Sequence, residues 1–136
     1  MSIIETAYGE QVAARLCTTI GSLDEATAAY QTTGDALVCL AADLATIRAR
    51  HEEALDKARS AHLGDPDLGG NDRARAANLA VRLHDDPTLD AKRDELARTQ
   101  RLHDEAERAH KNAYHQMESA RVAIGGYAAV LGATKG

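Results

Sequence analysis

Residues 89–131 decide the fold, and they read LDAKRDELARTQRLHDEAERAHKNAYHQMESARVAIGGYAAVL. Apolar or small side chains, together with two histidines and a threonine, recur every three, four or seven residues. This spacing corresponds to a repeat of about 3.5 residues. The repeat comprises Leu89, Leu96, Thr99, His103, Ala106, His110, Ala113, Met117, Ala120, Ile124, Tyr127 and Leu131. This period predicts one long helix over 89–131 that buries a narrow stripe against another helix.

A second stripe of the same period lies earlier in the chain. It comprises Leu23, Tyr30, Leu37, Leu40, Leu44, Ile47, His51, Ala54, Ala58 and Ala61. It predicts a first long helix over 23–63, and the two stripes together predict an all-α fold built on a long antiparallel coiled-coil helical hairpin. If Ser22 lies opposite Gly132, the hairpin pairs Tyr30 with Ile124 and His51 with His103.

Local signals predict the remaining elements of a single helical domain over 1–136. Ser22 and Glu25 fit a capping box, which separates a short N-terminal helix over 3–20 from the first long helix. Glycines and prolines interrupt the pattern over 64–88, the tip segment. Within it we expect a short helix over 72–84, capped by Asn71 or Asp72, and we expect Thr88 to cap the second long helix with Pro87 outside it.

The composition excludes several classes of protein. The 136 residues include 28 alanines and four tyrosines but no phenylalanine or tryptophan, so the bulky side chains of an all-β core are missing. No run approaches the roughly 20 apolar residues of a membrane span, and no signal-peptide pattern opens the chain. We therefore expect a cytoplasmic protein, in the host cytoplasm if it is phage-encoded. Cys17 and Cys39 lie in apolar stretches and are expected to be buried, reduced thiols.

Charge is distributed unevenly along the chain. Residues 1–47 hold six acids and one base, for a net charge of −5, whereas the remaining fifteen acids and fifteen bases cancel. A pair of helices cannot hide apolar side chains on every face, so the charge-poor terminal end predicts a homo-oligomer, with the N-terminal helix packed across or exchanged between subunits. The expected oligomer or hairpin interface consists of Leu16, Ile20, Leu23, Tyr30, Leu37, Met117, Ile124, Tyr127 and Leu131.

Catalytic and cofactor motifs are missing from the sequence. It holds no nucleophile with a plausible base, no GxxxxGK loop, and no HExxH or CxxC pair, so we expect no enzyme, no cofactor and no metal site. His51 and His103 are interpreted as polar stripe residues that set the register, with a metal site or pH switch as the alternative. The net charge of −5 argues against direct binding of nucleic acid.

The tip segment is the remaining candidate for specific recognition. Asn71, Arg73, Arg75 and Arg82 could form an anion-binding or partner-binding site at the start of the short helix. The alternative is structural: Asn71 caps the helix, and the arginines bridge to Asp65, Asp85 and Asp86.

The hinge sequence GGNDRARAANLAVRLHDDPTLDAKRDEL, residues 69–96, resembles that of small helical-hairpin proteins encoded in tailed-phage and prophage genomes. The matching positions are Gly70, Asn71, Arg75, Leu79, Leu83, Asp86, Pro87 and Leu89. The family has no settled biochemical activity, and its genes often lie near phage recombination and replication genes. The resemblance implies a non-enzymatic phage accessory protein that binds an unidentified protein partner from phage or host.

Two further hypotheses remain open. The protein could be an anti-defence factor that inhibits a host immune protein or sequesters a signalling nucleotide between subunits. It could also be a secreted helical hairpin of type VII export, which only the YxxxE spacing of Tyr114 and Glu118 suggests.

Overall fold

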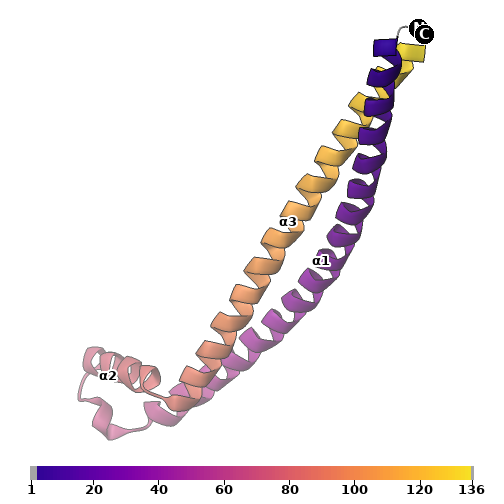
Figure 1. The fold of residues 1–136 in the computed structure, drawn as a ribbon. Coiled ribbons are helices and arrows are strands. Elements are labelled where there is room, and N and C mark those ends of the chain that lie inside the picture. Colours follow the sequence, from indigo (N-terminus) through magenta and orange to yellow (C-terminus); the bar gives the residue numbers. More distant parts are fainter. Residues whose placement is uncertain (1–2, 136) are drawn as a thin grey trace. The chain divides into compact units, whose positions relative to one another are not determined.

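The computed structural model describes residues 3–135 and the side chains of residues 6–133. The chain is all-α, as the stripes predict, and its described part contains no strand. Figure 1 shows the helices, which are α1 (Ile3–Leu63), the short 3-10 helix η1 (Pro66–Leu68), α2 (Asp72–His84) and α3 (Pro87–Lys135). No helix in the described range has the length and hydropathy needed to cross a lipid bilayer.

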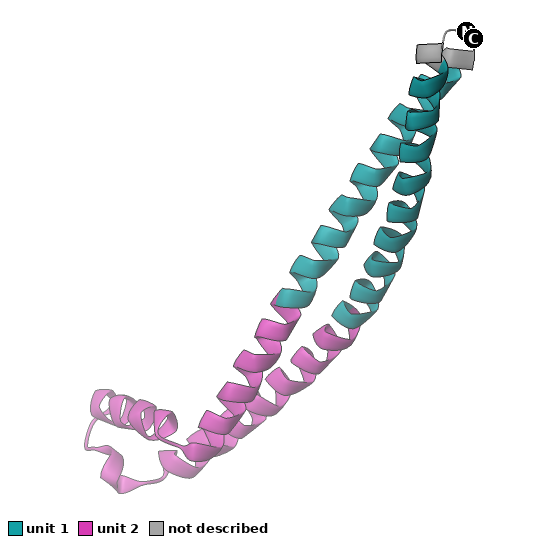
Figure 2. Cartoon of the chain, viewed as in Figure 1, with its two compact units in different colours: residues 1–37, 105–136 teal, residues 38–104 magenta. Residues whose placement is uncertain are grey.

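The chain divides into two compact units, coloured separately in Figure 2. Unit 1 consists of Met1–Leu37 and Glu105–Gly136, and unit 2 of Val38–Asp104. Both long helices contribute a segment to each unit. Unit 2 alone contains η1 and α2, because the whole tip segment lies within it.

In unit 1 the segments of α1 and α3 pack side by side in opposite directions. Tyr8 and Val130 line one cleft near the chain ends, and Ala26 and Ala120 line another further along. The most deeply buried side chains are small or flexible: Val12, Ala26, Ala113, Met117 and Ala120. Small side chains at these positions let the two backbones approach closely, so unit 1 needs no aromatic core.

Burial along α1 and α3 follows the predicted steps of three and four residues. In unit 1 the buried and half-buried positions include Leu16, Thr19, Leu23, Ala26, Tyr30, Thr33 and Leu37 on α1, and Ala106, His110, Ala113, Met117, Ala120, Ile124, Tyr127 and Leu131 on α3. In unit 2 they include Leu40, Leu44, Ile47, His51, Ala54 and Ala58 on α1, and Leu89, Lys92, Leu96, Thr99 and His103 on α3. We refer to these sets as the α1 stripe and the α3 stripe.

The predicted break near Ser22 is wrong, because α1 is continuous from Ile3 to Leu63 and the short N-terminal helix is its first part. The Ser22 hydroxyl does not cap a helix but donates to the carbonyl oxygen of Thr18, 3.2 Å away. Gly21 inside a helix costs about 1 kcal/mol relative to alanine. Stripe packing continues on both sides of Gly21, through Leu16 and Ala26, and outweighs that cost.

The predicted register is also wrong. The ring of Tyr30 stacks on His110, with centroids 4.3 Å apart and an interplanar angle of 17°, and it also meets Tyr114 at 6.0 Å. Tyr30 was expected to face Ile124, two helical turns or more further along α3. The register depended on a helix start at Ser22, so the error in the helix boundary produced the error in pairing.

α3 begins at Pro87, and Asp86 rather than Thr88 caps it. Asp86 Oδ1 accepts hydrogen bonds from the backbone N–H of Thr88 at 2.9 Å and of Leu89 at 3.4 Å. Proline suits the first helical position because it has no N–H that would need a partner, and its φ is already helical. The prediction that placed Pro87 outside the helix is therefore wrong by one or two residues.

Three small side chains expected to be buried are exposed. Cys17 and Cys39 are free thiols at the surface, because each lies one position off the α1 stripe, next to Leu16 and Leu40 respectively. Ala61 is exposed and His62 is half-buried instead, since a straight helix of 3.6 residues per turn drifts from a 3.5-residue repeat.

A close contact in unit 1 forms where Gly34 faces His110. Thr33 Oγ1 lies 2.7 Å from the carbonyl oxygen of Ala29 and 3.0 Å from His110 Nδ1, within hydrogen-bond distance of both. A Cβ atom on Gly34 would lie 3.2 Å from His110 Cε1. The glycine therefore makes room for the imidazole between Tyr30 and Thr33.

Gly34→Ala is expected to lower the free energy of unfolding by about 1 kcal/mol, because overpacking costs about 1–3 kcal/mol and exceeds the gain in helix propensity. Gly125→Ala is the matched control, since a Cβ there meets nothing within 4 Å. It should stabilise the chain by about 0.5–1 kcal/mol. Urea denaturation, monitored by circular dichroism, measures the unfolding free energy of each variant. Equal stabilisation by the two substitutions would contradict the close contact at His110.

Candidate functional site

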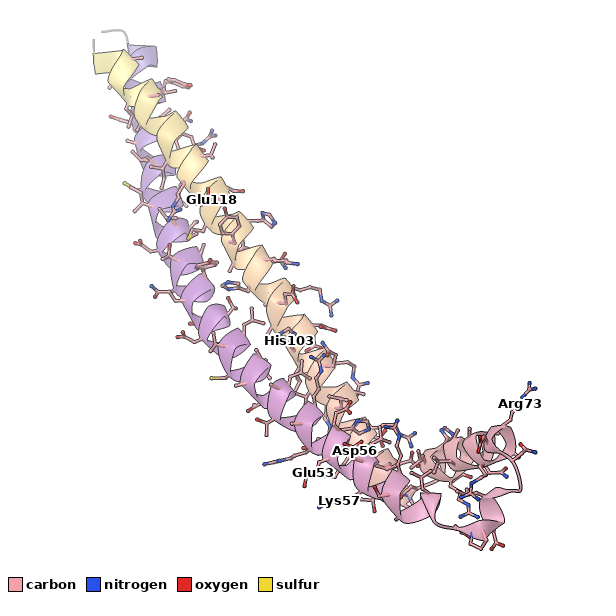
Figure 3. All side chains as sticks on the ribbon, turned by 180° about the vertical axis from the view of Figure 1, so that it is seen from behind. Glu53, Asp56, Lys57, Arg73, His103 and Glu118 are labelled. Carbon is pink, nitrogen blue, oxygen red and sulfur yellow. The ribbon has the colours of Figure 1, made fainter. Side chains whose placement is uncertain are left out.

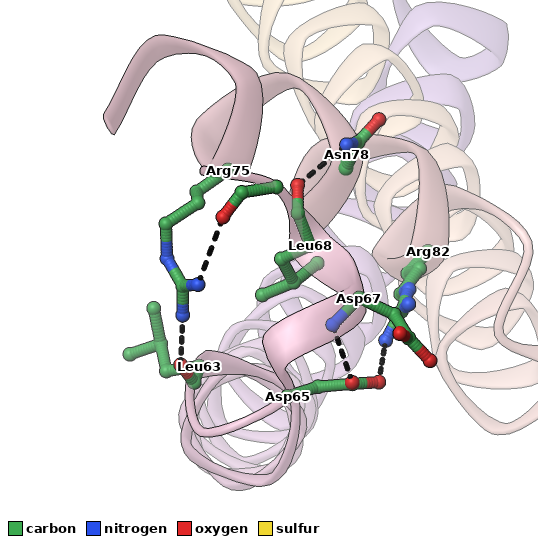
Figure 4. A network of polar contacts seen from close by, with 8 residues as sticks. Leu63, Asp65, Asp67, Leu68, Arg75, Asn78 and Arg82 are labelled. Atoms are coloured by element: carbon green, nitrogen blue, oxygen red, sulfur yellow. Dashed lines mark hydrogen bonds and ion pairs between the residues drawn. The ribbon is translucent and has the colours of Figure 1, made fainter. Parts of the chain in front are cut away.

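The tip segment is organised around Leu68, whose side chain is fully buried at 0% exposure. Asp65 starts η1 by accepting the backbone N–H of Asp67 on its Oδ1 at 2.9 Å (Figure 4). Gly69 then turns the chain at φ 128°, a left-handed conformation that favours glycine, and a Cβ there would lie 3.1 Å from that of Ala74. This turn holds η1 against α2.

α2 attaches to the tip through polar side chains, as Figure 4 shows. Asn78 Nδ2 donates to the carbonyl oxygen of Leu68 at 2.5 Å. Arg75 donates to the carbonyl oxygens of Gly69 at 3.2 Å and Leu63 at 2.6 Å. Arg82 forms an ion pair with Asp65. The contacts satisfy backbone carbonyls that a tight turn leaves without partners.

Two arginines in unit 2 cap helix C-termini. Leu63 is the last residue of α1, and its carbonyl accepts from Arg75. At the end of α2, Arg93 Nη2 donates to the carbonyl oxygens of Leu83 at 2.9 Å and His84 at 3.1 Å. The last carbonyls of a helix have no partner within it, and a cation also suits the negative end of its dipole. These guanidinium groups therefore stabilise helix ends.

The predicted tip residues separate into structural and free groups. Asn71 is the N-cap of α2, which spans the range predicted from the sequence, and its Oδ1 accepts the backbone N–H of Ala74 at 2.8 Å. Arg75 and Arg82 belong to the network above. Arg73 has no ion-pair or hydrogen-bond partner among the described residues and projects away from α2 in Figure 3. Of the three carboxylates proposed to bridge the arginines, Asp65 alone does so in the described structure.

Asp65 has a pKa below the ordinary aspartate value. The largest cause is the hydrogen bond from Arg82, and the backbone hydrogen bond from Asp67 adds to it, although partial desolvation opposes both. Each of these partners interacts more strongly with the ionised carboxylate. The ion pair therefore stabilises the tip when Asp65 is charged.

Asp65→Asn is expected to destabilise the tip at neutral pH and to make no difference in acid. Because the folded pKa is lowered, the stabilisation is present above the unfolded pKa of about 3.9 and disappears as pH falls through the folded value. Amide hydrogen exchange of α2, followed from pH 7 downward, measures the difference, which should shrink steadily in acid. Asp67→Asn is the control, because the described contacts of Asp67 involve only its backbone. A similar pH-dependent loss of α2 stability in this variant would contradict the role of Asp65.

The outward face of α2 carries small apolar side chains and Arg73, which has no partner among the described residues. Ala76, Ala77 and Ala80 are exposed, and Val81 is 58% exposed. Arg73, Ala77, Ala80 and Val81 recur at helical spacing and so share one face. No residue of α2 is buried. Leu79 and Leu83 are half-buried on the inward side together with Arg75 and Arg82, so the alanines and Val81 are apolar side chains left over on the outward side. We call Arg73, Ala77, Ala80 and Val81 the α2 face.

The predicted interface residues lie mostly along the stripes of unit 1. Leu16, Leu23, Tyr30, Leu37, Ile124, Tyr127 and Leu131 are half-buried, and Met117 is buried. Ile20 differs, being 43% exposed. Tyr8, Tyr114 and Val122 are also exposed in unit 1 but were not predicted, because the prediction searched for the stripe and these side chains lie off it.

His51 and His103 both lie on stripes of unit 2, but they are not at the same level. Arg48 Nη2 donates to Gln100 Oε1 at 2.7 Å, which fixes the local pairing between the antiparallel segments. Counting along both segments from that pair places His51 near Ala97. Ala97 precedes His103 by six residues, which is a little under two helical turns. His51 Nε2 and His103 Nδ1 are buried and have no hydrogen-bond partner within the described range.

The chain was compared with protein-family models, with curated proteins and with solved structures, and none of the three comparisons finds a match.

Proposed function

We propose that the chain is a non-enzymatic phage accessory protein that binds a protein partner through the α2 face, in phage recombination or replication. The observation that carries the partner-binding part is the exposure of apolar side chains on the α2 face, where Val81 is 58% exposed. A surface helix normally buries its apolar stripe and exposes its polar side. Here the inward side holds Leu79 and Leu83 beside the bonded Arg75 and Arg82. Ala77, Ala80 and Val81 nevertheless face solvent. The phage context rests on the resemblance of the hinge.

The chemistry of the α2 face indicates the kind of partner. Alanine side chains allow another backbone to approach closely, and Val81 offers apolar area whose burial is favourable. Arg73 has no carboxylate partner within the described structure, so its guanidinium is available for a bidentate contact with an acidic residue. The expected partner surface is therefore apolar with an aspartate or glutamate at its edge.

The test is affinity capture from phage-infected cells with the full chain and two double variants. Arg73→Glu with Val81→Glu changes the α2 face, whereas Arg98→Glu with Val38→Glu makes the same charge change at other exposed positions of unit 2. We expect the first double variant to lose the partner and the second to retain it, with unchanged circular dichroism. An identified annealing protein or nuclease supports the proposal, an immune factor supports the anti-defence alternative, and equal capture by both variants overturns the α2 face as the binding surface.

We further propose that the chain is an antiparallel coiled-coil hairpin that forms a homo-oligomer through unit 1. Its support is the exposure of Tyr8, Ile20, Tyr114 and Val122 in a unit whose α1 segment carries little charge. Single exposed apolar side chains are common on monomers. Four large ones on a unit built from two helix segments are explained if other copies of the chain cover them. Light scattering at micromolar concentration should give a multiple of 14.5 kDa, and a monodisperse monomer would exclude the oligomer.

A further inference from the structure

Unit 2 contains a cleft of about 490 Å³ between the end of α1 and the start of α3. Its apolar lining comes from Ala54, Ala58 and Leu89. The cleft exists because Ala54 and Ala58 occupy stripe positions with side chains too short to fill the space. Pockets that hold small molecules span about 300–1,000 Å³, so the cleft is of suitable size for a small ligand.

The rim of the cleft has an excess of available positive charge. Of its two carboxylates, Glu53 forms an ion pair with Lys57 at 3.4 Å, both labelled in Figure 3, and Asp86 caps α3. Arg50 and Lys92 also line the cleft. Neither has a carboxylate within ion-pair distance among the residues that the structure describes. The lining therefore has three cations against two carboxylates, and neither Arg50 nor Lys92 forms an ion pair with a described residue.

Lys92 departs from the pattern that builds the rest of the stripe. It lies three residues after Leu89 and four before Leu96, and it is half-buried. The other positions of the α3 stripe carry apolar, small or histidine side chains. A lysine at such a position packs its aliphatic stem against the helix pair and directs its ammonium group to the rim. Departures of this kind from a consistent pattern are expected at functional sites, where a ligand supplies the missing partner.

We propose that this cleft binds a nucleoside monophosphate, with the phosphate between Arg50 and Lys92 and the base over Ala54, Ala58 and Leu89. A phosphate monoester carries a charge of −1.5 to −2 near pH 7, and Arg50 and Lys92 are the two lining cations that no described carboxylate pairs with. The Thr88 hydroxyl, also in the lining, is a further donor for a phosphate oxygen. The apolar lining suits the face of a nucleobase. This inference does not rest on the proposed partner of α2.

The experiment titrates the full chain separately with adenosine monophosphate, inorganic phosphate and adenosine. Calorimetry measures the affinity, and amide chemical shifts locate the binding site. We expect saturable binding of the monophosphate, with shifts at residues of the cleft, and binding at least about tenfold weaker for phosphate or adenosine alone, since each makes half of the contacts. Arg50→Gln with Lys92→Gln should weaken monophosphate binding at least about tenfold, the scale of a lost hydrogen bond to a charged group. Arg98→Gln with Arg101→Gln is the control, because it removes the same charge from exposed positions of α3.

A third variant tests the cleft without changing charge. Ala58→Leu keeps a residue that favours helix and fills the hollow, so it should abolish monophosphate binding while circular dichroism stays unchanged. Equal affinity for phosphate and monophosphate would show a simple anion site and overturn the nucleotide assignment. Equal weakening by the two charge variants, binding retained in Ala58→Leu, or no saturable binding to the wild-type chain would each overturn the site.

Discussion

Leu68→Ala is expected to destabilise unit 2 by about 2–5 kcal/mol, because it removes a fully buried side chain and leaves a cavity. No residue of α2 is buried, so Leu68 provides the apolar anchor on which η1 and the polar contacts of α2 are assembled. The hydrogen bond from Asn78 and the turn at Gly69 both depend on the position of this residue. Amide exchange in α2 should therefore accelerate strongly.

Leu63→Ala is the matched control for this prediction. The Leu63 side chain is 54% exposed, and its contact with Arg75 uses only the backbone carbonyl. A surface substitution of this kind changes stability by about 0.5 kcal/mol or less. If Leu68→Ala proved as mild as Leu63→Ala in urea denaturation and hydrogen exchange, the tip would not depend on a buried core residue.

Ala113→Glu is expected to destabilise unit 1 by about 3 kcal/mol or more, because it places an unpaired carboxylate at a position only 4% exposed. Alanine and glutamate both favour helices, so intrinsic propensity changes little. Helices separated from their packing partners are only marginally stable in water. Loss of the contact should therefore lower helicity as well as the melting temperature, both measured by circular dichroism.

Ala109→Glu makes the same substitution one turn earlier on α3, at an exposed position. It should change stability by no more than about 0.5 kcal/mol. Equal melting temperatures for the two variants would mean that Ala113 is not buried against α1. The pair therefore tests the stripe packing on which both units depend.

Local patterns in the sequence determined the class of fold and several element boundaries. The 3.5-residue repeat from Leu89 to Leu131 predicted a long helix with a buried stripe, and burial follows those positions. The range of α2 and its Asn71 cap were also predictable, because a cap depends on residues three positions apart. The same patterns indicated the tip arginines as a group, since they lie close together in the chain.

Only the tertiary structure decided how these elements pair and what each side chain does. The Ser22 capping box was overridden because stripe packing on both sides of Gly21 favours one continuous helix. The pairing of Tyr30 with His110 depends on contacts 80 residues apart in sequence, which no local pattern encodes. Arg75, Arg82 and Arg73 have the same chemistry in sequence. Their roles differ because of their surroundings in the fold. Arg75 donates to the last carbonyl of α1, Arg82 pairs with Asp65, and Arg73 projects into solvent.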